Sequence, residues 1–319
     1  MAVNSNFDYL ATTTLQAAST DIADNYTKHI GLLWFIKKGN GMRTQEGGRK
    51  ILEGISYKKN STFGMIAKTG MISSTPQDTI SNAEYDWKYA AGTIAYYDAD
   101  VQMNRGKNQV YNLLQQLKKD AMRSITEVIA EQLYNDDTTT TTNLTGLQLA
   151  VAETPTTGSY GGINRATAGN EFWRNYYYST VVSAFSSAGQ TAMNTTYLNL
   201  VRGTDKPTVW VTTMAIWALY QLSLTTNVRY SDTNTANAGF VNLLHMDIPV
   251  IFDYYCPSGN MYCLNTNHLF WNVMSGRDAW VEGFYPSDNQ LTYSSKVATY
   301  GNLSGDWAAG QGVVNSVTG

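Results

Sequence analysis

The sequence is poor in charge. Asp, Glu, Lys and Arg together make up 15% of its 319 residues, whereas soluble domains typically contain about 25%. The formal net charge at pH 7 is −3. A balance so close to neutral gives no electrostatic reason to expect nucleic-acid binding as the main activity.

Cysteine and histidine are also scarce. Two cysteines, Cys256 and Cys263, are too few for a disulfide framework or a multi-cysteine zinc site, and we expect both thiols to stay reduced. The three histidines, His29, His245 and His268, lie far apart, and none has a second metal ligand three or four residues away. The sequence therefore predicts no metal site and no cofactor.

Long apolar runs and catalytic motifs are missing as well. No run of about 18 apolar residues is present, so we expect no membrane span. The first nine residues lack the basic start and apolar core of a signal peptide. There is no P-loop, no glycine-rich dinucleotide motif after a strand and no Gly-x-Ser-x-Gly. These absences predict a non-enzymatic protein that stays inside a cell, or inside a particle assembled there.

Aromatic residues are plentiful, at 12% of the chain, and 22 of them are tyrosines. Protein interfaces are rich in aromatic residues and poor in Lys, Glu and Asp. The composition therefore fits a protein that partners cover over much of its surface. It fits equally well a polar globule with half-buried tyrosines.

The N-terminal part combines an unpatterned stretch with a helix. Residues 1–14 are polar and predict an extended arm, whereas residues 15–38 have apolar side chains near a period of 3.6. Trp34 and Phe35 lie near the end of this helix, which Gly39 and Gly41 terminate.

A long two-armed ribbon is expected over residues 50–101. Residues 51–57, 61–66 and 93–101 have the composition of strands, and Ala83, Tyr85, Trp87 and Tyr89 alternate with charged residues. A turn cluster at residues 73–78 separates the two arms. Because a two-stranded ribbon is barely stable alone in water, it needs a surface to lie on.

The strongest helical pattern covers residues 108–135. Apolar residues recur there every three or four positions, which predicts a helix about 40 Å long that can act as a spine. We expect the buried side of this helix to contain Leu113, Leu117, Ile125, Ile129 and Leu133.

The second half mixes helices and strands without a strict alternation. Helices are predicted over residues 171–188, 192–202 and 214–224, and strands over 207–213, 248–254, 260–264 and 290–299. The strands at 248–254 and 260–264 should form a hairpin around the Pro257-Ser258-Gly259 turn. The fold class is therefore α+β.

The order of these parts resembles the major capsid proteins of tailed bacteriophages, which have the Hong Kong phage-type shell fold. The resemblance spans nearly the whole chain. It rests on four stretches that occur in order: Gly47-Gly48-Arg49-Lys50-Ile51, Asn104-Arg105-Gly106-Lys107, Gly161-Gly162-Ile163-Asn164-Arg165 and Gly301-Asn302-Leu303.

The resemblance implies a division of the chain into parts. Residues 1–48 would be the N-terminal arm, 49–98 the extended E-loop, 99–145 the P-domain with its spine helix, 146–267 the A-domain and 268–319 a return to the P-domain. The ribbon would lie across a neighbouring subunit. Its expected contact residues are Tyr57, Phe63, Tyr85, Trp87 and Tyr89, and those of the arm are Trp34 and Phe35.

The implied function is assembly. Copies of the chain would form pentamers and hexamers, and these would build an icosahedral shell around the double-stranded DNA genome of a tailed phage. The chain would be made in the bacterial host cytoplasm and end in the virion. Expected partners are further copies of the chain, portal, scaffolding and decoration proteins, and DNA bound non-specifically on the inner face. Scaffolding would come from a separate protein or be absent.

Two alternatives remain open. An encapsulin-like protein cage with the same fold would enclose a cargo enzyme instead of a genome. A carbohydrate-binding or glycoside-acting protein would use its Trp and Tyr side chains to stack on sugars, and an enzyme of that kind would need two close carboxylates.

Overall fold

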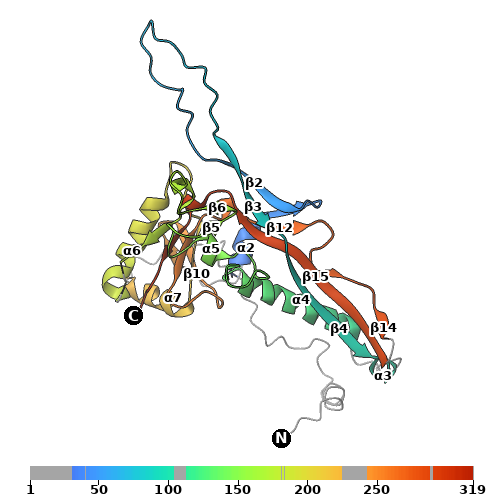
Figure 1. The fold of residues 1–319 in the computed structure, drawn as a ribbon. Helices are drawn as coiled ribbons and strands as arrows, with labels where there is room; N and C mark the ends of the chain where they lie inside the picture. Colours follow the sequence, from blue (N-terminus) through green and yellow to red (C-terminus); the bar gives the residue numbers. More distant parts are fainter. Residues whose placement is uncertain are drawn as a thin grey trace. The chain divides into compact units, whose positions relative to one another are not determined.

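The computed structural model describes residues 31–39, 41–103, 113–180, 182, 184–224, 243–287 and 290–318 (Figure 1). Contacts divide these residues into two compact units. The smaller unit takes the described residues of Ala90–Ile129 and Gly276–Thr299. The larger unit takes those of Ile30–Tyr89, Ala130–Ser275 and Tyr300–Gly319.

Among the described residues, the smaller unit consists of two helices and the strands that pair with one long strand. β15 (Gln290–Gly305) pairs with β4 (Lys88–Tyr97) and, antiparallel, with β13 (Trp280–Val281) and β14 (Tyr285–Ser287). α3 (Asp98–Met103) follows β4, and α4 (Leu113–Gln132) contributes its residues up to Ile129. Tyr96 stacks on Tyr293 with ring centroids 5.4 Å apart.

The first sheet of the larger unit is built on β12 (Leu269–Met274). β12 pairs antiparallel with residues 301–305 of β15 and parallel with β1 (Met42–Gln45). α2 (Gly31–Lys38) lies against β12 and buries Leu32 and Ile36. Lys37 and Lys38 occupy its last turn, where positive charge stabilises the helix end.

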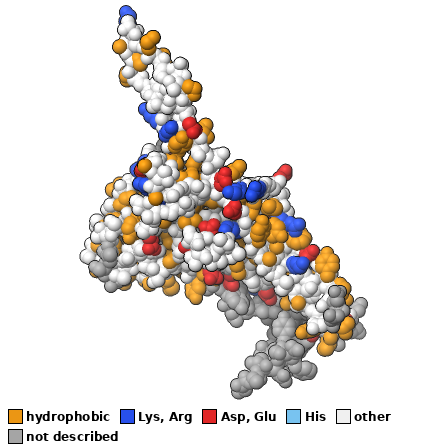
Figure 2. All heavy atoms as spheres, in the orientation of Figure 1, with side chains coloured by type: hydrophobic (Ala, Val, Ile, Leu, Met, Phe, Trp, Pro, Cys, Tyr) orange, Lys and Arg blue, Asp and Glu red, His pale blue; other side chains and the backbone are white. Residues whose placement is uncertain are grey.

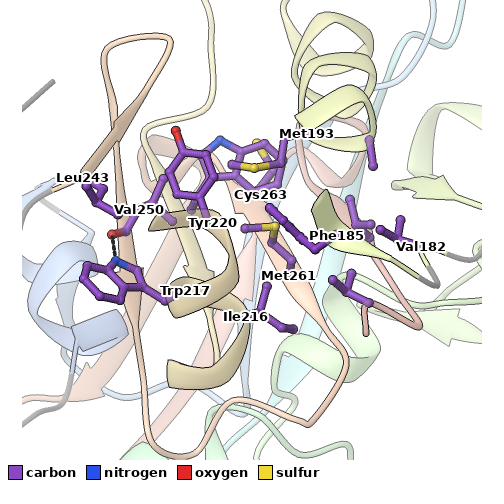
Figure 3. Close-up of a cluster of buried hydrophobic side chains, with 14 of the residues drawn as sticks. Val182, Phe185, Met193, Ile216, Trp217, Tyr220, Leu243, Val250, Met261 and Cys263 are labelled. Carbon is purple, nitrogen blue, oxygen red and sulfur yellow. Dashed lines mark hydrogen bonds between the residues drawn. The ribbon is translucent and has the colours of Figure 1, made fainter. Parts of the chain in front are cut away.

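The second sheet of the larger unit has six strands among the described residues. Their spatial order is β7 (Tyr176–Tyr178), β16 (Gly312–Val314), β11 (Met261–Leu264), β8 (Val209–Thr212), β10 (Ile248–Phe252) and β9 (Leu243–His245). α6 (Phe185–Leu200) and α7 (Met214–Ser223) pack against each other and against this sheet, and together they enclose an apolar core (Figure 3). The indole N–H of Trp217 donates to the carbonyl of Val250, 3.1 Å away.

Two expectations about this part of the chain are wrong. β10 and β11 do not pair with each other, because β8 lies between them, parallel to β10 and antiparallel to β11. All four side chains of β8 are buried, which is typical of a central strand. Residues 171–188 do not form one helix either: they contain the 3-10 helix η2 (Glu171–Trp173), the edge strand β7 and the start of α6. Consecutive tyrosines favour a strand over a helix.

The end of α4 meets the next part of the chain at Gly146. A Cβ atom at this position would lie 2.4 Å from the carbonyl oxygen of Asn135 and 2.6 Å from that of Leu133. The Leu133 oxygen accepts a hydrogen bond from the amide of Leu147, at 2.7 Å, where α5 (Leu147–Ala150) begins. The backbones approach so closely that only glycine fits.

We predict that Gly146→Ala lowers the free energy of unfolding by about 1–3 kcal/mol, because the new methyl group must push backbone atoms apart. Chemical denaturation of the unassembled protein measures this change. Gly283→Ala is the matched control, since no atom lies within 4 Å of a Cβ there. Equal stabilities of the two variants would contradict the prediction.

His245 is a buried histidine in the core of the second sheet. Its Nε2 lies 2.9 Å from the Asn194 Oδ1, its Nδ1 has no hydrogen-bond partner, and the ring packs edge-on against Trp210 and Tyr220. Burial lowers the pKa of His245 to about 4. The imidazole is therefore neutral in the folded protein at pH 7.

We predict that the folded state loses stability as the pH falls from about 6.5 to about 4. In this window the unfolded chain binds a proton at His245 and the folded chain does not. The free energy of unfolding therefore falls by on the order of 3 kcal/mol. Denaturation curves at pH 7 and pH 4.5 test this. His245→Gln should remove this part of the pH dependence, and an unchanged pH dependence in that variant would argue against it.

Candidate assembly interface

The ribbon begins as a regular hairpin. β2 (Lys50–Ser56) and β3 (Ile80–Asp86) pair antiparallel over seven residues, from Lys50 opposite Asp86 to Ser56 opposite Ile80. The inner face is apolar: Ile51, Ile55, Ala83 and Tyr85 are buried within the chain. The root of the ribbon therefore lies on its own subunit.

Tyr85 anchors this inner face. Its hydroxyl donates to the carbonyl of Gly305, at 2.7 Å, and its ring packs edge-on against Tyr160. Tyr160 stacks in turn on Trp173. Desolvation raises the pKa of Tyr85 well above its usual value, so the hydroxyl remains a donor.

A buried arginine supports the aromatic stack. Arg165 donates to the carbonyls of Leu149, Ala150 and Trp173, at 2.8, 2.7 and 3.1 Å. Burial lowers the pKa of its guanidinium. Three backbone acceptors thus take the place of a carboxylate partner and hold the loop that carries Tyr160 against α5.

The ribbon also contacts this loop through its backbone. The amide of Glu84 donates to the carbonyl of Gly161, at 2.9 Å. Gly161 has a φ of +56°, and a Cβ atom there would lie 2.9 Å from the side chains of Ala83 and Tyr85. Glycine is required here both by the backbone conformation and by the lack of space.

Glu53 holds the other strand of the ribbon. One oxygen of this buried carboxylate accepts from Arg43 at 2.6 Å, and the other accepts from Ser304 at 2.8 Å and from Asn272 at 3.4 Å. The Arg43 guanidinium also stacks 3.2 Å above the ring of Phe270. One carboxylate therefore connects β2 to β1, β12 and β15.

Asn302 fixes the point where the ribbon joins the sheet. Its amide donates to the Asp86 carbonyl at 2.8 Å, and its oxygen accepts from the Thr145 amide at 3.0 Å. The next ribbon residues are held too. The Trp87 indole donates to the carbonyl of Gly48, and the buried Lys88 amine lies 3.1 Å from a carboxylate oxygen of Asp137.

Beyond the paired strands, residues 57–79 form a long loop that the other described residues leave uncovered (Figures 1 and 2). Its large apolar side chains are 57–103% exposed: Phe63, Met65, Ile66, Met71 and Ile72. The loop also carries Lys58, Lys59 and Lys68 but only one acidic residue, Asp78. The strand expected over residues 61–66 is not present, because this part of the loop pairs with no strand among the described residues.

The five predicted contact residues of the ribbon differ in the exposure of their side chains. Phe63 and Tyr89 are 74% and 63% exposed, and Tyr57 is half-buried against Phe172. Tyr85 and Trp87 are only 2% and 7% exposed. For these two the expected contact with a neighbour is corrected, since they anchor the ribbon on its own subunit.

The two predicted arm residues lie on α2. Phe35 is buried in the chain, and Trp34 is half-buried under the amine of Lys38. The start of the helix is fixed by Asp253, whose buried carboxylate accepts from the Leu32 amide at 3.2 Å. Desolvation raises the pKa of Asp253. Residues 1–30, with the expected arm and His29, lie outside the described residues.

Four of the five predicted core residues of the spine helix lie on α4, and Leu133 follows its last residue. Ile125, Ile129 and Leu133, just beyond the helix end, are buried, and Leu117 is half-buried. The side chain of Leu113 lies outside the description.

The described part of the chain offers no candidate metal site. No three His, Cys, Asp or Glu side chains there are placed to hold a metal ion, and no helix there is long and apolar enough to cross a membrane. Cys256 and Cys263 are buried and not joined by a disulfide. A hollow of about 200 Å³ in the smaller unit is lined by Ala, Gly, Val, Ile and hydroxyl side chains, which offer no acid or base.

The anchored ribbon, the long helix and the six-stranded sheet together define the Hong Kong phage-type capsid fold. The capsid protein of cyanophage A-1(L) is similar over 95% of this chain and 96% of its own, with a TM-score of 0.76 and 19% identity. The capsid of the native GTA particle matches over 100% and 99%, with a TM-score of 0.65 and 10% identity. The SrpI encapsulin of Synechococcus elongatus PCC 7942 matches over 97% and 95%, with a TM-score of 0.58 and 10% identity. No protein-family profile and no curated protein matches the sequence.

Sequence reasoning missed the polar anchors. Arg165 and Asn302 lie in stretches that carry the family resemblance, but nothing in those stretches shows that their side chains are buried. One signal was available for Glu53: it sits between Ile51 and Ile55 at a spacing of two, so it belongs to the apolar face of its strand.

We predict that Glu53→Ala lowers the free energy of unfolding by about 2–4 kcal/mol, because it leaves Asn272 and Ser304 buried without their acceptor. Glu84→Ala on the partner strand is the matched control. Glu84 forms an exposed ion pair with Lys50, so its loss should cost less than about 1 kcal/mol. Denaturation of both variants measures the difference, and equal losses would refute the role of Glu53.

Proposed function

We propose that this chain is the major capsid protein of a tailed phage. Copies of the chain assemble through pentamers and hexamers into an icosahedral shell around double-stranded DNA. The fold agrees with this function, because two of the similar structures are the capsids of a cyanophage and of the GTA particle. Its role is structural, and the protein catalyses no reaction.

The uncovered loop at residues 57–79 carries the proposal. Five large apolar side chains stand in water there, and burying each completely would gain about 1.5–3 kcal/mol. Monomeric proteins rarely leave such a surface exposed without an interaction partner. A second copy of the chain covers the loop in the assembled shell, and the anchored root gives the loop a fixed starting point.

The structural elements suggest how the shell parts map onto the chain. Residues 1–48 serve as the N-terminal arm, 49–98 as the E-loop, 99–145 with 268–319 as the P-domain, and 146–267 as the A-domain. α4 is the spine helix of the P-domain, and the six-stranded sheet with α6 and α7 is the body of the A-domain.

Other partners follow from the same proposal. The shell interacts with portal, scaffolding and decoration proteins, and its inner face binds DNA without sequence preference. The protein is made in the bacterial cytoplasm and ends in the virion.

A second candidate, an encapsulin-like cage, is favoured by one observation. The fold of the SrpI encapsulin matches nearly the whole chain. The two candidates differ in what the shell contains: nucleic acid in a phage head, a protein cargo in an encapsulin. Absorbance spectra and nuclease-protected DNA from purified particles distinguish them.

The loop predicts the outcome of an assembly experiment. Phe63→Ser combined with Met71→Ser should raise the protein concentration needed for assembly at least about tenfold, since each subunit loses more than about 1.4 kcal/mol of contact. Sedimentation and negative-stain electron microscopy of wild type and variant measure the assembled fraction.

The control variant combines Thr69→Ala with Ser74→Ala, two exposed polar positions on the same loop. It should assemble like wild type. Both double variants should unfold within about 0.5 kcal/mol of wild type, because their side chains contribute little to the monomer. Normal shells from the Phe63→Ser and Met71→Ser variant would refute the loop as an assembly contact. A wild-type protein that remains monomeric would refute the proposed function.

A further inference from the structure

Two short connectors join the two sheets of the larger unit. One runs from β11 to β12 through the 3-10 helix η3 (Thr266–His268), and the other runs from β15 to β16 through η4 (Ala308–Gly310). These two connectors, residues 265–268 and 306–311, contact each other and form a neck between the sheets, which α2 also bridges through its contacts with β12 and β8.

The first contact between the connectors is a neutral amide pair. The backbone amide of Asn265 donates to the Gln311 Oε1 at 2.9 Å, and the Gln311 Nε2 donates to the Asn265 carbonyl at 3.1 Å. Both residues are 1% exposed. Because neither group titrates, this contact holds at any pH at which the protein is folded.

The second contact is ionic. The Nδ1 of His268 lies 2.8 Å from an oxygen of Asp306, and both side chains are partly open to solvent. The imidazole packs edge-on against Trp307, with ring centroids 4.9 Å apart. Asp205, from the turn after α6, adds a second negative charge that acts on the ring.

We propose that the His268–Asp306 pair is a pH-sensitive clasp on this neck. The protonated imidazolium holds the two connectors together, and its deprotonation loosens them while the amide pair keeps them joined. The inference goes beyond the proposed function: it concerns the coupling of the two sheets within one subunit.

The direction of the effect follows from the charges around the ring. The hydrogen bond to Asp306 raises the pKa of His268, which burial partly opposes. Protonated His268 thus stabilises the folded protein, and this contribution is fully present below about pH 6.5. This contribution disappears as the pH rises through the folded-state pKa.

Hydrogen exchange and histidine NMR on the wild-type chain test the clasp. After correction for intrinsic exchange rates, protection at the amides of Asn265, His268 and Gln311 should fall about two- to fivefold between pH 6 and pH 8.5. The ring signal of His268 should titrate above pH 6.5, whereas that of His245 serves as an internal reference that titrates far lower.

Three variants provide the controls. In His268→Gln the protection of these amides should no longer depend on pH, and in Asp306→Asn the pKa of His268 should fall towards its ordinary value. His245→Gln should leave the neck unchanged. A wild-type His268 that titrates at or below pH 6.5 would overturn the proposal. So would the same pH-dependent loss of protection in His268→Gln.

Discussion

The buried carboxylate of Glu53 is the interaction on which the ribbon depends. A two-stranded hairpin is barely stable alone, so it needs a surface and a fixed orientation on that surface. The apolar face of β2 and β3 supplies burial, but apolar contacts are not directional. Glu53 adds directional hydrogen bonds to Arg43, Asn272 and Ser304, and these fix the root of the ribbon against the sheet.

This anchorage divides the ribbon into two parts with different tasks. The paired strands belong to the core of their own subunit, so their conformation is set before any partner arrives. The loop at residues 57–79 has few contacts of its own and exposes its apolar side chains. In the proposed shell, a fixed root and an uncovered loop would together let one chain reach neighbours in slightly different surroundings. The same fold occurs in capsids and in an encapsulin, so the fold alone does not determine the function.

Much of the fold could be predicted from local patterns. The period of two at Ala83 and Tyr85 predicted the ribbon, and the spacing of apolar residues predicted α4. The alternation failed at Tyr89, because Lys88 turns inward to reach Asp137 and shifts the pattern by one residue. The predicted hairpin of β10 and β11 is wrong, because strand order depends on parts of the chain that are distant in sequence. Here β8 lies between the two strands. The hydrogen-bond partners of the polar anchors could not be predicted for the same reason: those of Glu53 and Asn302 lie up to 251 residues away.

The scarcity of charge in the sequence is more marked on the surface of the protein, because several charged side chains are buried as anchors. Several of the few charged side chains are buried, namely Glu53, Lys88, Arg165 and Asp253, and each has hydrogen-bond partners inside the chain. The outer surface is therefore poorer in charge than the composition alone suggests. Neutral Thr, Asn and Tyr side chains lose less hydration free energy on burial than ions do. A surface of this kind can be covered by neighbouring subunits through many weak contacts at low desolvation cost.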